Sequence, residues 1–171
     1  MTVALVPMTL ADIDAVVAIE SIAAPRPWTA GVFADELAQP QTRSYTVATV
    51  DGVVVGFCGL LVAADEGHIT NIAVDPANRR SGIATRLVLD AFTEARQRGA
   101  WALTLEVRAS NSGAQRLYHR FGFVPSGVRP RYYDDNGEDA IIMWTEAIAD
   151  EAMQSRLDTI QQNLALQEQT A

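Results

Sequence analysis

A turn signal between two long apolar stretches constrains the fold of this chain more than any other feature. Asp51-Gly52 separates residues 44–50 from residues 53–62, and both stretches are rich in β-branched residues. An Asp-Gly pair in this setting is the preferred sequence of a two-residue hairpin turn, because both turn positions need a positive φ. Residues 67–75 make a third stretch of the same kind. We therefore expect an antiparallel meander over residues 44–75.

The hydrophobic period changes after this meander. Residues 82–98 carry apolar side chains at a spacing that predicts a helix, at Ile83, Leu87, Ala91 and Ala95. The remaining elements are expected to be a strand over 101–107, a helix over 112–121, and a hairpin of strands over 123–133 and 138–145. Strands followed by a crossover helix and a further strand imply a mixed α/β sheet.

Two capped helices are expected before the meander. Residues 2–7 form a short strand, after which Thr9 begins a helix, with Asp12 at the capping-box position. The apolar face of this helix includes Leu10. Thr29 begins a second, shorter helix.

Composition changes near residue 147. Residues 1–146 are expected to form one domain, and residues 147–171 a Gln-rich C-terminal extension. Apolar side chains in the extension lie at helical spacing, at Met153, Leu157, Ile160 and Leu164. The extension is therefore predicted to be helical, and it either packs on its own domain, frays, or binds a partner.

Charge and composition exclude several classes of function. The net charge of −8 opposes nucleic-acid binding, because phosphates need a basic surface. Cys58 is the one cysteine, which excludes a disulfide framework and a cysteine-based zinc site. No apolar run is long enough to span a membrane, and residues 1–10 lack a signal-peptide pattern. A cytoplasmic protein is the default expectation.

The segment that connects the third strand of the meander to the long helix has the properties of an anion site. The unpaired amides of a first helical turn and the helix dipole attract anions. Small residues at Gly82 and Ala84 let a ligand approach the backbone, and Arg79 and Arg80 add positive charge. A pyrophosphate fits here, although the residues alone also permit a basic loop before an ordinary helix. The Walker P-loop and the three-glycine dinucleotide motif are both absent.

The sequence Arg79-x-x-Gly82-x-Ala84 resembles the acetyl-CoA pyrophosphate motif of the GNAT N-acetyltransferase superfamily. Residues 71–76 (NIAVDP) resemble its bulged fourth strand, and residues 105–111 (LEVRASN) and 117–123 (LYHRFGF) resemble its later motifs. Residues 105–111, 131–133 and 138–143 also resemble the RimI branch, which acetylates the N-terminal alanine of a small-subunit ribosomal protein.

The resemblance implies a fold and a cosubstrate. The fold is a mixed, mostly antiparallel sheet of about seven strands with splayed central strands, flanked by about four helices. The cosubstrate is acetyl-CoA, and no metal is needed. The pantetheine arm is expected along the backbone of Ile72, Ala73 and Val74 and beside Asn111. The pyrophosphate is expected at Arg79, Arg80, Ser81, Gly82, Ile83, Ala84 and Thr85. A bulge in the fourth strand would open a slot beside the strand at 103–107.

Acetyl transfer requires a neutral amine. An α-amino group, with a pKa near 8, has an advantage of about 3.4 kcal/mol over lysine in reaching the neutral form at neutral pH. A carboxylate can still assist by accepting the proton as the amine attacks. Glu106 lies at the end of a strand beside the expected slot, and the resemblance gives it this role. The alternative is a rim carboxylate that pairs with Arg108.

A departing thiolate requires a proton or a hydrogen bond. A phenol can supply either, and Tyr118 matches the general acid of the family. The alternative is that Tyr118 packs with Ala114, Leu117 and Phe121 as one helix face.

Four residues are candidates for contact with the acceptor: Trp28, Arg131, Tyr132 and Tyr133. Residues 27–29 (PWT) resemble the loop between the first two helices of the RimI branch. The two tyrosines precede an acidic turn and could equally form cross-strand packing pairs. Cys58, His68 and His119 show no spacing that indicates a nucleophile, a metal site or a triad.

We therefore expect an acetyl-CoA-dependent enzyme that acetylates a protein N-terminal α-amine. Two alternatives stay open. One is a GNAT enzyme that acetylates lysine side chains or a small-molecule amine. The other is a non-catalytic acetyl-CoA-binding module, which the presence of both Glu106 and Tyr118 opposes.

Overall fold

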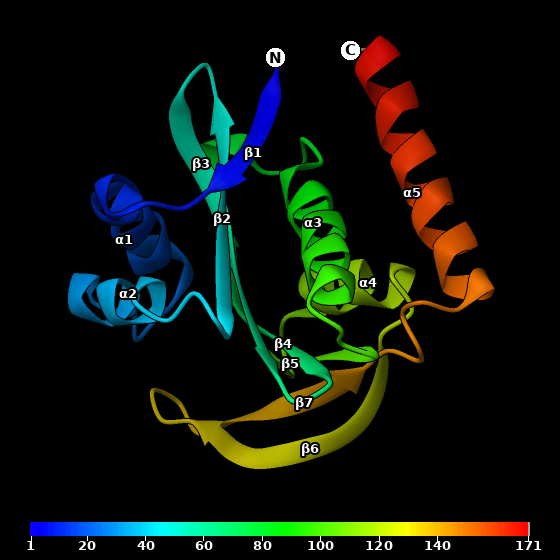
Figure 1. Ribbon diagram of the computed structural model, residues 1–171. Helices are drawn as coiled ribbons and strands as arrows, with labels where there is room; N and C mark the ends of the chain where they lie inside the picture. The colour runs from blue at the N-terminus through cyan, green and yellow to red at the C-terminus, as the bar shows by residue number, and fades with distance from the viewer. Residues whose placement is uncertain (171) are drawn as a thin grey trace.

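The computed structural model describes residues 1–170 and contains a seven-stranded sheet (Figure 1). The strands are β1 (Val3–Pro7), β2 (Arg43–Val50), β3 (Val53–Ala63), β4 (Glu66–Val74), β5 (Ala102–Arg108), β6 (Val124–Tyr133) and β7 (Glu138–Trp144). Their order across the sheet is β1-β2-β3-β4-β5-β7-β6. The last hairpin therefore joins the sheet with β7 beside β5. This confirms the expected mixed, mostly antiparallel fold.

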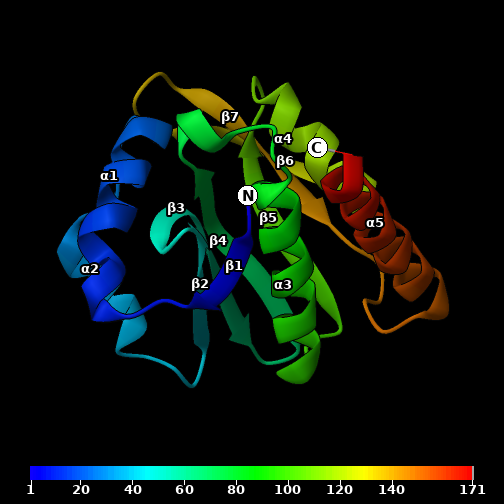
Figure 2. The same ribbon diagram turned by 90° about the horizontal axis from the view of Figure 1, so that it is seen from above.

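Helices cover both faces of the sheet. They are α1 (Ile13–Ala23), α2 (Ala30–Leu37), α3 (Ile83–Gln97), α4 (Ser112–Arg120) and α5 (Glu151–Thr170), with short 3-10 turns at Leu10–Asp12 and Pro76–Asn78. Helices α1 and α2 lie on one face, and α3 and α4 lie on the other, with α5 outside them (Figure 2). Each face has its own core. Phe33 and Phe57 belong to the α1 side, and Phe92 and Leu103 belong to the α3 side.

Local signals explain most of the element boundaries. Thr9 N donates to Asp12 Oδ2 at 2.8 Å, which is the predicted capping-box contact. The turn residues Asp51 and Gly52 have φ values of 50° and 80°, as the hairpin requires.

The prediction that Leu10 contributes to a buried helix face is wrong. Leu10 is 69% exposed, whereas Ile13 and Val16 are buried. The reason is that residues 10–12 form a 3-10 turn, whose three-residue period presents side chains on different faces from the α-helix that follows.

β4 and β5 form the one parallel strand pair in the sheet of residues 1–170, and they pair over a short distance. Residues 66–68 of β4 pair with residues 102–104 of β5. Further along β4, the register between β4 and β3 shifts by one residue. Gly59 of β3 pairs with Asn71 of β4, whereas the next residue, Leu60, pairs with Ile69. Thr70 is thus an extra residue in β4. Such a bulge bends its strand, and β4 separates from β5 beyond it. The predicted bulge and splay are confirmed.

Tyr45 holds this bulge in place. The Tyr45 hydroxyl lies 3.2 Å from Thr70 Oγ1 and 3.1 Å from Glu36 Oε2, and Tyr45 is 4% exposed. Its ring crosses directly over Gly59. A Cβ atom at residue 59 would overlap that ring and lie 2.6 Å from Thr70 Oγ1. Glycine at this position is therefore a packing requirement of the bulge.

Helix α5 lies in the segment where the sequence predicts a C-terminal extension. Met153 and Leu157 join the core on the α3 side, and Leu164 is also buried. The helix therefore packs on its own chain, while a division of the chain at residue 146 stays a prediction. No helix within residues 1–170 is both long and apolar enough to cross a membrane.

We predict that Gly59→Ala destabilises the fold by about 1–3 kcal/mol, because the Tyr45 ring or the bulge must shift to accommodate the methyl group. Urea unfolding followed by circular dichroism measures the effect. Gly127→Ala in β6 is the matched control, since a Cβ atom there lies 3.5 Å from its nearest neighbour, an ordinary contact. Equal unfolding free energies for the two variants would contradict this packing account.

Candidate active site

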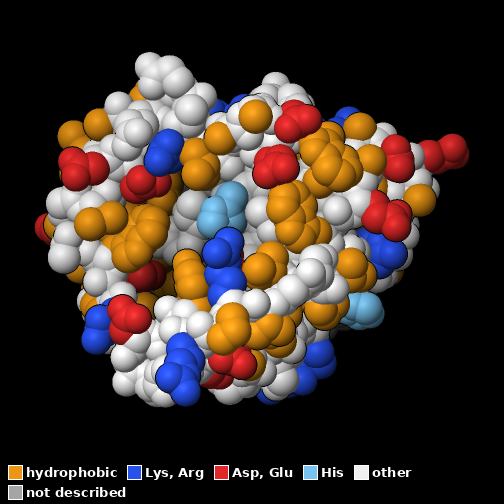
Figure 3. All heavy atoms as spheres, turned by 90° about the horizontal axis from the view of Figure 1, so that it is seen from below, with side chains coloured by type: hydrophobic (Ala, Val, Ile, Leu, Met, Phe, Trp, Pro, Cys, Tyr) orange, Lys and Arg blue, Asp and Glu red, His pale blue; other side chains and the backbone are white. Residues whose placement is uncertain are grey.

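A cleft of about 590 Å³ lies where β4 and β5 separate. Its walls include residues 69–72 of β4, residues 105–108 of β5, and Tyr118 of α4. The loop between α1 and α2 and the turn between β6 and β7 border it on the other side. Figure 3 shows a histidine and an arginine side chain near the centre of the lower face, with hydrophobic side chains around them. The fold thus brings Glu106 and Tyr118 to one cleft.

Two side chains, those of His68 and Arg129, contact the Glu106 carboxylate. His68 Nε2 lies 2.6 Å from Glu106 Oε2, and Arg129 Nε lies 3.4 Å from Glu106 Oε1. The hydrogen bond from His68 lowers the pKa of Glu106, more than partial burial raises it, and the charge of Arg129 lowers it further. The side chain is 14% exposed. Glu106 is therefore an ionised carboxylate at neutral pH that can accept a proton from a bound ligand.

Tyr118 contributes to both the core and the cleft. It is 6% exposed, and its ring packs against Phe123 with 5.7 Å between the centroids. Burial raises the pKa of Tyr118 well above that of a free phenol. The hydroxyl therefore stays protonated at neutral pH, which suits a proton donor and not a base.

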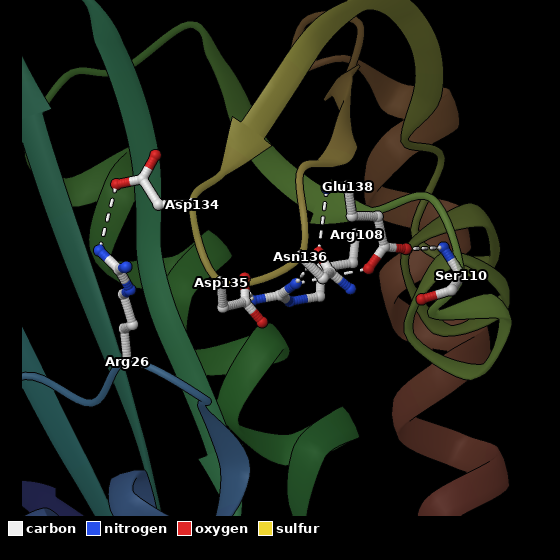
Figure 4. Close-up of polar contacts among 7 residues, drawn as sticks. All are labelled: Arg26, Arg108, Ser110, Asp134, Asp135, Asn136 and Glu138. Atoms are coloured by element: carbon white, nitrogen blue, oxygen red, sulfur yellow. Dashed lines mark hydrogen bonds and ion pairs between the residues drawn. The ribbon is translucent and has the colours of Figure 1, made fainter.

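Arg108 does not pair with Glu106. Its guanidinium lies 3.0 Å from Asp135 Oδ1 and 3.4 Å from Glu138 Oε1 (Figure 4). It also lies 3.9 Å from the centroid of the Tyr133 ring. Arg108 therefore organises the turn between β6 and β7 at the border of the cleft. The side-chain partners of Glu106 are therefore His68 and Arg129, and not Arg108.

Acidic side chains outnumber basic ones around this cleft. Those that line it are Glu20, Glu106, Asp134 and Asp135, against Arg26 and Arg108. Arg26 Nη1 lies 3.4 Å from Asp134 Oδ2, and this ion pair connects the α1–α2 loop to the β6–β7 turn (Figure 4). Burial raises the pKa of Glu20, although a hydrogen bond from the Trp28 amide lowers it. A cleft with this charge favours a cationic group such as an ammonium.

The loop after β4 has the geometry of an anion site. Arg80 and Gly82 adopt left-handed φ values of 61° and 78°. Gly82 is the N-cap of α3, so the amides of the first turn of α3 lack helical partners. Arg79, Arg80, Gly82 and Ala84 line a second cleft, of about 690 Å³.

Three of the predicted loop residues use their side chains within the protein. Ser81 Oγ donates to Asn78 O, and Ile83 is 1% exposed. Thr85 Oγ1 accepts from Arg120 Nη2 at 3.3 Å. Ser81 and Ile83 thus have only their backbone amides to offer an anion.

The backbone of Ile72, Ala73 and Val74 has one free edge. Its other edge pairs with β3, whereas pairing with β5 ends at residue 68. Asn71 Nδ2 is buried without a hydrogen-bond partner within residues 1–170, and Asn71 lines the first cleft. A free strand edge and an unused buried donor fit the amides and carbonyls of a pantetheine arm. Asn111 also lines this cleft, and its Oδ1 caps α4 by accepting from Ala114 N at 3.1 Å.

The candidate acceptor-binding residues divide into two groups. Tyr132 and Tyr133 line the first cleft, and their rings pack together with centroids 5.2 Å apart. The Trp28 ring instead packs against the Phe33 ring, with 5.6 Å between their centroids. The backbone N–H of Arg131 donates to Asp139 Oδ1 at 2.9 Å. Neither Trp28 nor Arg131 lines the cleft.

Several residues of the site were not predicted from the sequence. His68, which showed no informative spacing, contacts Glu106 because the parallel register sets His68 beside Thr104. Glu20, Arg26 and Asn71 line the cleft from three different elements. Only the strand register could have identified His68. For Glu20 the one signal was a carboxylate among the apolar positions of the first helix.

A comparison of the sequence with known protein families identifies the family of this chain. The sequence model of the acetyltransferase (GNAT) family matches residues 13–123, which include the anion-binding loop, Glu106 and Tyr118. The chain belongs to this family, and it is an N-acetyltransferase. The resemblance implied by the four motifs is confirmed.

Within the family, the chain is similar to the ribosomal-protein-alanine N-acetyltransferases of the RimI branch. It is 43% identical over 137 residues to a candidate ribosomal protein bS18-alanine N-acetyltransferase of Bacillus subtilis, covering 80% of this chain and 91% of that protein. Identity to the ribosomal protein bS18-alanine N-acetyltransferase of Escherichia coli is 38% over 134 residues, covering 77% and 89%. The crystal structure of the ribosomal-protein-S18-alanine N-acetyltransferase from Escherichia coli aligns with a TM-score of 0.79 at 35% identity, covering 88% and 97% of the two chains.

We predict that His68→Ala moves the acidic limb of the kcat/KM pH profile to higher pH. The pKa of Glu106 is lowered in the folded protein, so activity that needs its carboxylate is present above that pKa and is lost as pH falls through it. Loss of the His68 hydrogen bond raises the pKa, and the loss of activity then begins at a higher pH. Initial rates across a pH series measure the shift. His119→Ala, at an exposed position of α4, is the control, and coincident acidic limbs for the two variants would refute the role of His68.

Proposed function

We propose that this enzyme transfers the acetyl group of acetyl-CoA to the α-amino group of a protein N-terminus, and that its substrate is the N-terminal alanine of a small-subunit ribosomal protein. The observation that carries the proposal is the acidic cleft between β4 and β5, with Glu106 on one wall and Tyr118 on another. The similarity to enzymes named for ribosomal protein bS18-alanine supports the choice of acceptor.

Acetyl-CoA is the acetyl donor, as family membership and both clefts support. Its pantetheine arm lies along Ile72, Ala73 and Val74, whose free edge can pair with the amides of the arm as a neighbouring strand would. Asn71 Nδ2 and Asn111 offer further polar contacts. Its pyrophosphate lies at the amides of residues 80–85, between Arg79 and Arg80.

Glu106 acts as the base. The acceptor enters the cleft as an ammonium and releases one proton to solvent, which leaves the neutral amine. The amine nitrogen then attacks the thioester carbonyl and loses its second proton to the Glu106 carboxylate, directly or through water. His68 is a positioning residue, because its hydrogen bond fixes the Glu106 carboxylate and keeps it ionised. No covalent intermediate with the protein is needed.

Tyr118 acts as the acid. Collapse of the tetrahedral intermediate breaks the carbon–sulfur bond and releases the CoA thiolate. The Tyr118 hydroxyl, kept protonated by burial, donates a proton to that sulfur. The products are the N-acetylated acceptor, CoA with a free thiol, and the one proton that the ammonium released to solvent. The proton that Glu106 takes from the attacking nitrogen balances the one that Tyr118 gives to sulfur.

Charge at the cleft supports a free N-terminus as the acceptor. Glu20, Asp134 and Asp135 lie around the entrance, where they attract an ammonium group. Tyr132, which is 49% exposed, offers a surface for the first residues of the peptide. Trp28 and Arg131 stay candidates for contacts further along the peptide. A cytoplasmic location, without nucleic-acid or membrane partners, stays a prediction from the sequence.

We predict that Glu106→Gln and Tyr118→Phe each lower kcat by about 100-fold, because each removes one proton transfer. Both changes are nearly isosteric, so CoA affinity should change little. Steady-state rates and calorimetric CoA titration measure the two quantities separately. Unchanged turnover in both variants would favour a non-catalytic binding module and would refute this mechanism.

The acceptor class is tested with a peptide panel. We predict rapid acetylation of a peptide that begins with the sequence of ribosomal protein bS18 after its initiator methionine, and loss of that activity when the N-terminus is blocked. Mass spectrometry locates the acetyl group. Activity confined to blocked, lysine-containing peptides would instead assign the enzyme to side-chain acetylation.

A further inference from the structure

Helix α5 lies beside the anion-binding loop, away from the cleft that contains Glu106. The views in Figures 1 and 2 agree in setting α5 next to α3. Leu164 of α5 lies over the Cα atom of Gly82, where an added Cβ would be 2.8 Å from Leu164 Cδ2. Helix α5 therefore contacts the anion-binding loop itself. This helix follows residues 13–123, the part of the chain that the family model matches.

Polar contacts fix α5 in this position along its length. Arg156 Nη1 donates to the Arg120 carbonyl at 3.2 Å, at the end of α4. Arg86 Nη2 donates to Glu168 Oε1 at 2.5 Å, one turn after the start of α3. Met153 and Leu157 also belong to the hydrophobic core on the α3 side of the sheet. The helix is thus attached to both α3 and α4, and it forms one side of the cleft between them.

This second cleft is strongly cationic. Arg79 and Arg80 line it from the loop, and Arg116 and Arg120 line it from α4. No Asp or Glu lines it, although the whole chain carries a net charge of −8. Four cations without a counter-charge in an acidic protein indicate a ligand with several negative charges.

One face of α5 completes the cleft. Ile160, Asn163, Leu164 and Gln167 line it, at the spacing of a single helix face. Within residues 1–170, the side-chain amides of Asn163 and Gln167 make no hydrogen bond, and both residues are exposed. Two free amides thus face four guanidinium groups across a space of about 690 Å³.

We propose that α5 is a wall of the cosubstrate site and that Asn163 and Gln167 bind the nucleotide end of acetyl-CoA. This inference rests on the proposed function, which sets the pyrophosphate at the loop and the pantetheine arm in the first cleft. The adenosine 3′,5′-bisphosphate end of the same molecule then extends from the loop into the second cleft. Its phosphates meet the arginines, while its adenosine lies against Ile160 and Leu164 and accepts hydrogen bonds from the two amides.

Calorimetric titration with CoA and with adenosine 3′,5′-bisphosphate tests the proposal. The double variant Asn163→Ala/Gln167→Ala should bind both ligands about tenfold more weakly than the unchanged chain, a loss of about 1.4 kcal/mol, because two hydrogen bonds to the nucleotide are removed. Turnover with acetyl-pantetheine, a donor without the nucleotide, should not change. Gln162→Ala is the matched control, because Gln162 is exposed on α5 and lines neither cleft.

Three outcomes would contradict this account in distinguishable ways. Equal affinity of the double variant and the unchanged chain for adenosine 3′,5′-bisphosphate would show that the amides of Asn163 and Gln167 do not bind the nucleotide. Tighter binding by the double variant would make α5 an obstruction to the nucleotide and not a wall of its site. Failure of the unchanged chain to bind CoA at all would overturn the proposed function, and the role of α5 with it.

Discussion

The separation of β4 from β5 is the constraint on which the rest of this structure depends. Neighbouring strands normally pair along their length, because an unpaired backbone amide or carbonyl is costly once it is removed from water. Here the pairing stops after residue 68 of β4, and the bulge at Thr70 directs the strand away. Tyr45 and Gly59 hold the bulge by packing against it. The protein thereby keeps one strand edge ready for a ligand to occupy, and the same opening exposes Glu106 to that ligand.

Charge is distributed so that the two clefts attract different groups. The cleft with Glu106 has more carboxylates than cations, whereas the cleft beside α5 has four arginines and no carboxylate. Acetyl-CoA is polyanionic at its nucleotide end and uncharged at its thioester, and an ammonium acceptor is cationic. Under the proposed function, the positive field orients the donor along the loop, and the negative field brings the acceptor to the reactive end of the donor. Overall acidity alone could not achieve this, because it would repel the phosphates.

Much of the fold could be predicted from local signals in the sequence. The hairpin at Asp51-Gly52 and the helix after Gly82 depend on residues close in the chain, and the structure has both. What was missed depended mostly on geometry across the chain. The contact between His68 and Glu106 follows from a parallel register that no local pattern encodes. Arg108, which shares a strand face with Glu106, pairs with acidic residues of a turn nearly thirty positions away. The misassigned Leu10 reflects a 3-10 turn that an α-helical pattern cannot distinguish.

The arginines of the second cleft have a consequence for the chemical inertness of the protein. All 13 basic residues of the chain are arginine, and the sequence contains no lysine. A guanidinium group stays protonated at any physiological pH and is a poor nucleophile, whereas a lysine amine reacts slowly with thioesters even without a catalyst. The one thiol, on Cys58, is 3% exposed. Under the proposed function, the positive charges that bind the reactive acyl donor are therefore groups that the donor cannot modify. The side chains of the protein offer no amine on which self-acylation could accumulate.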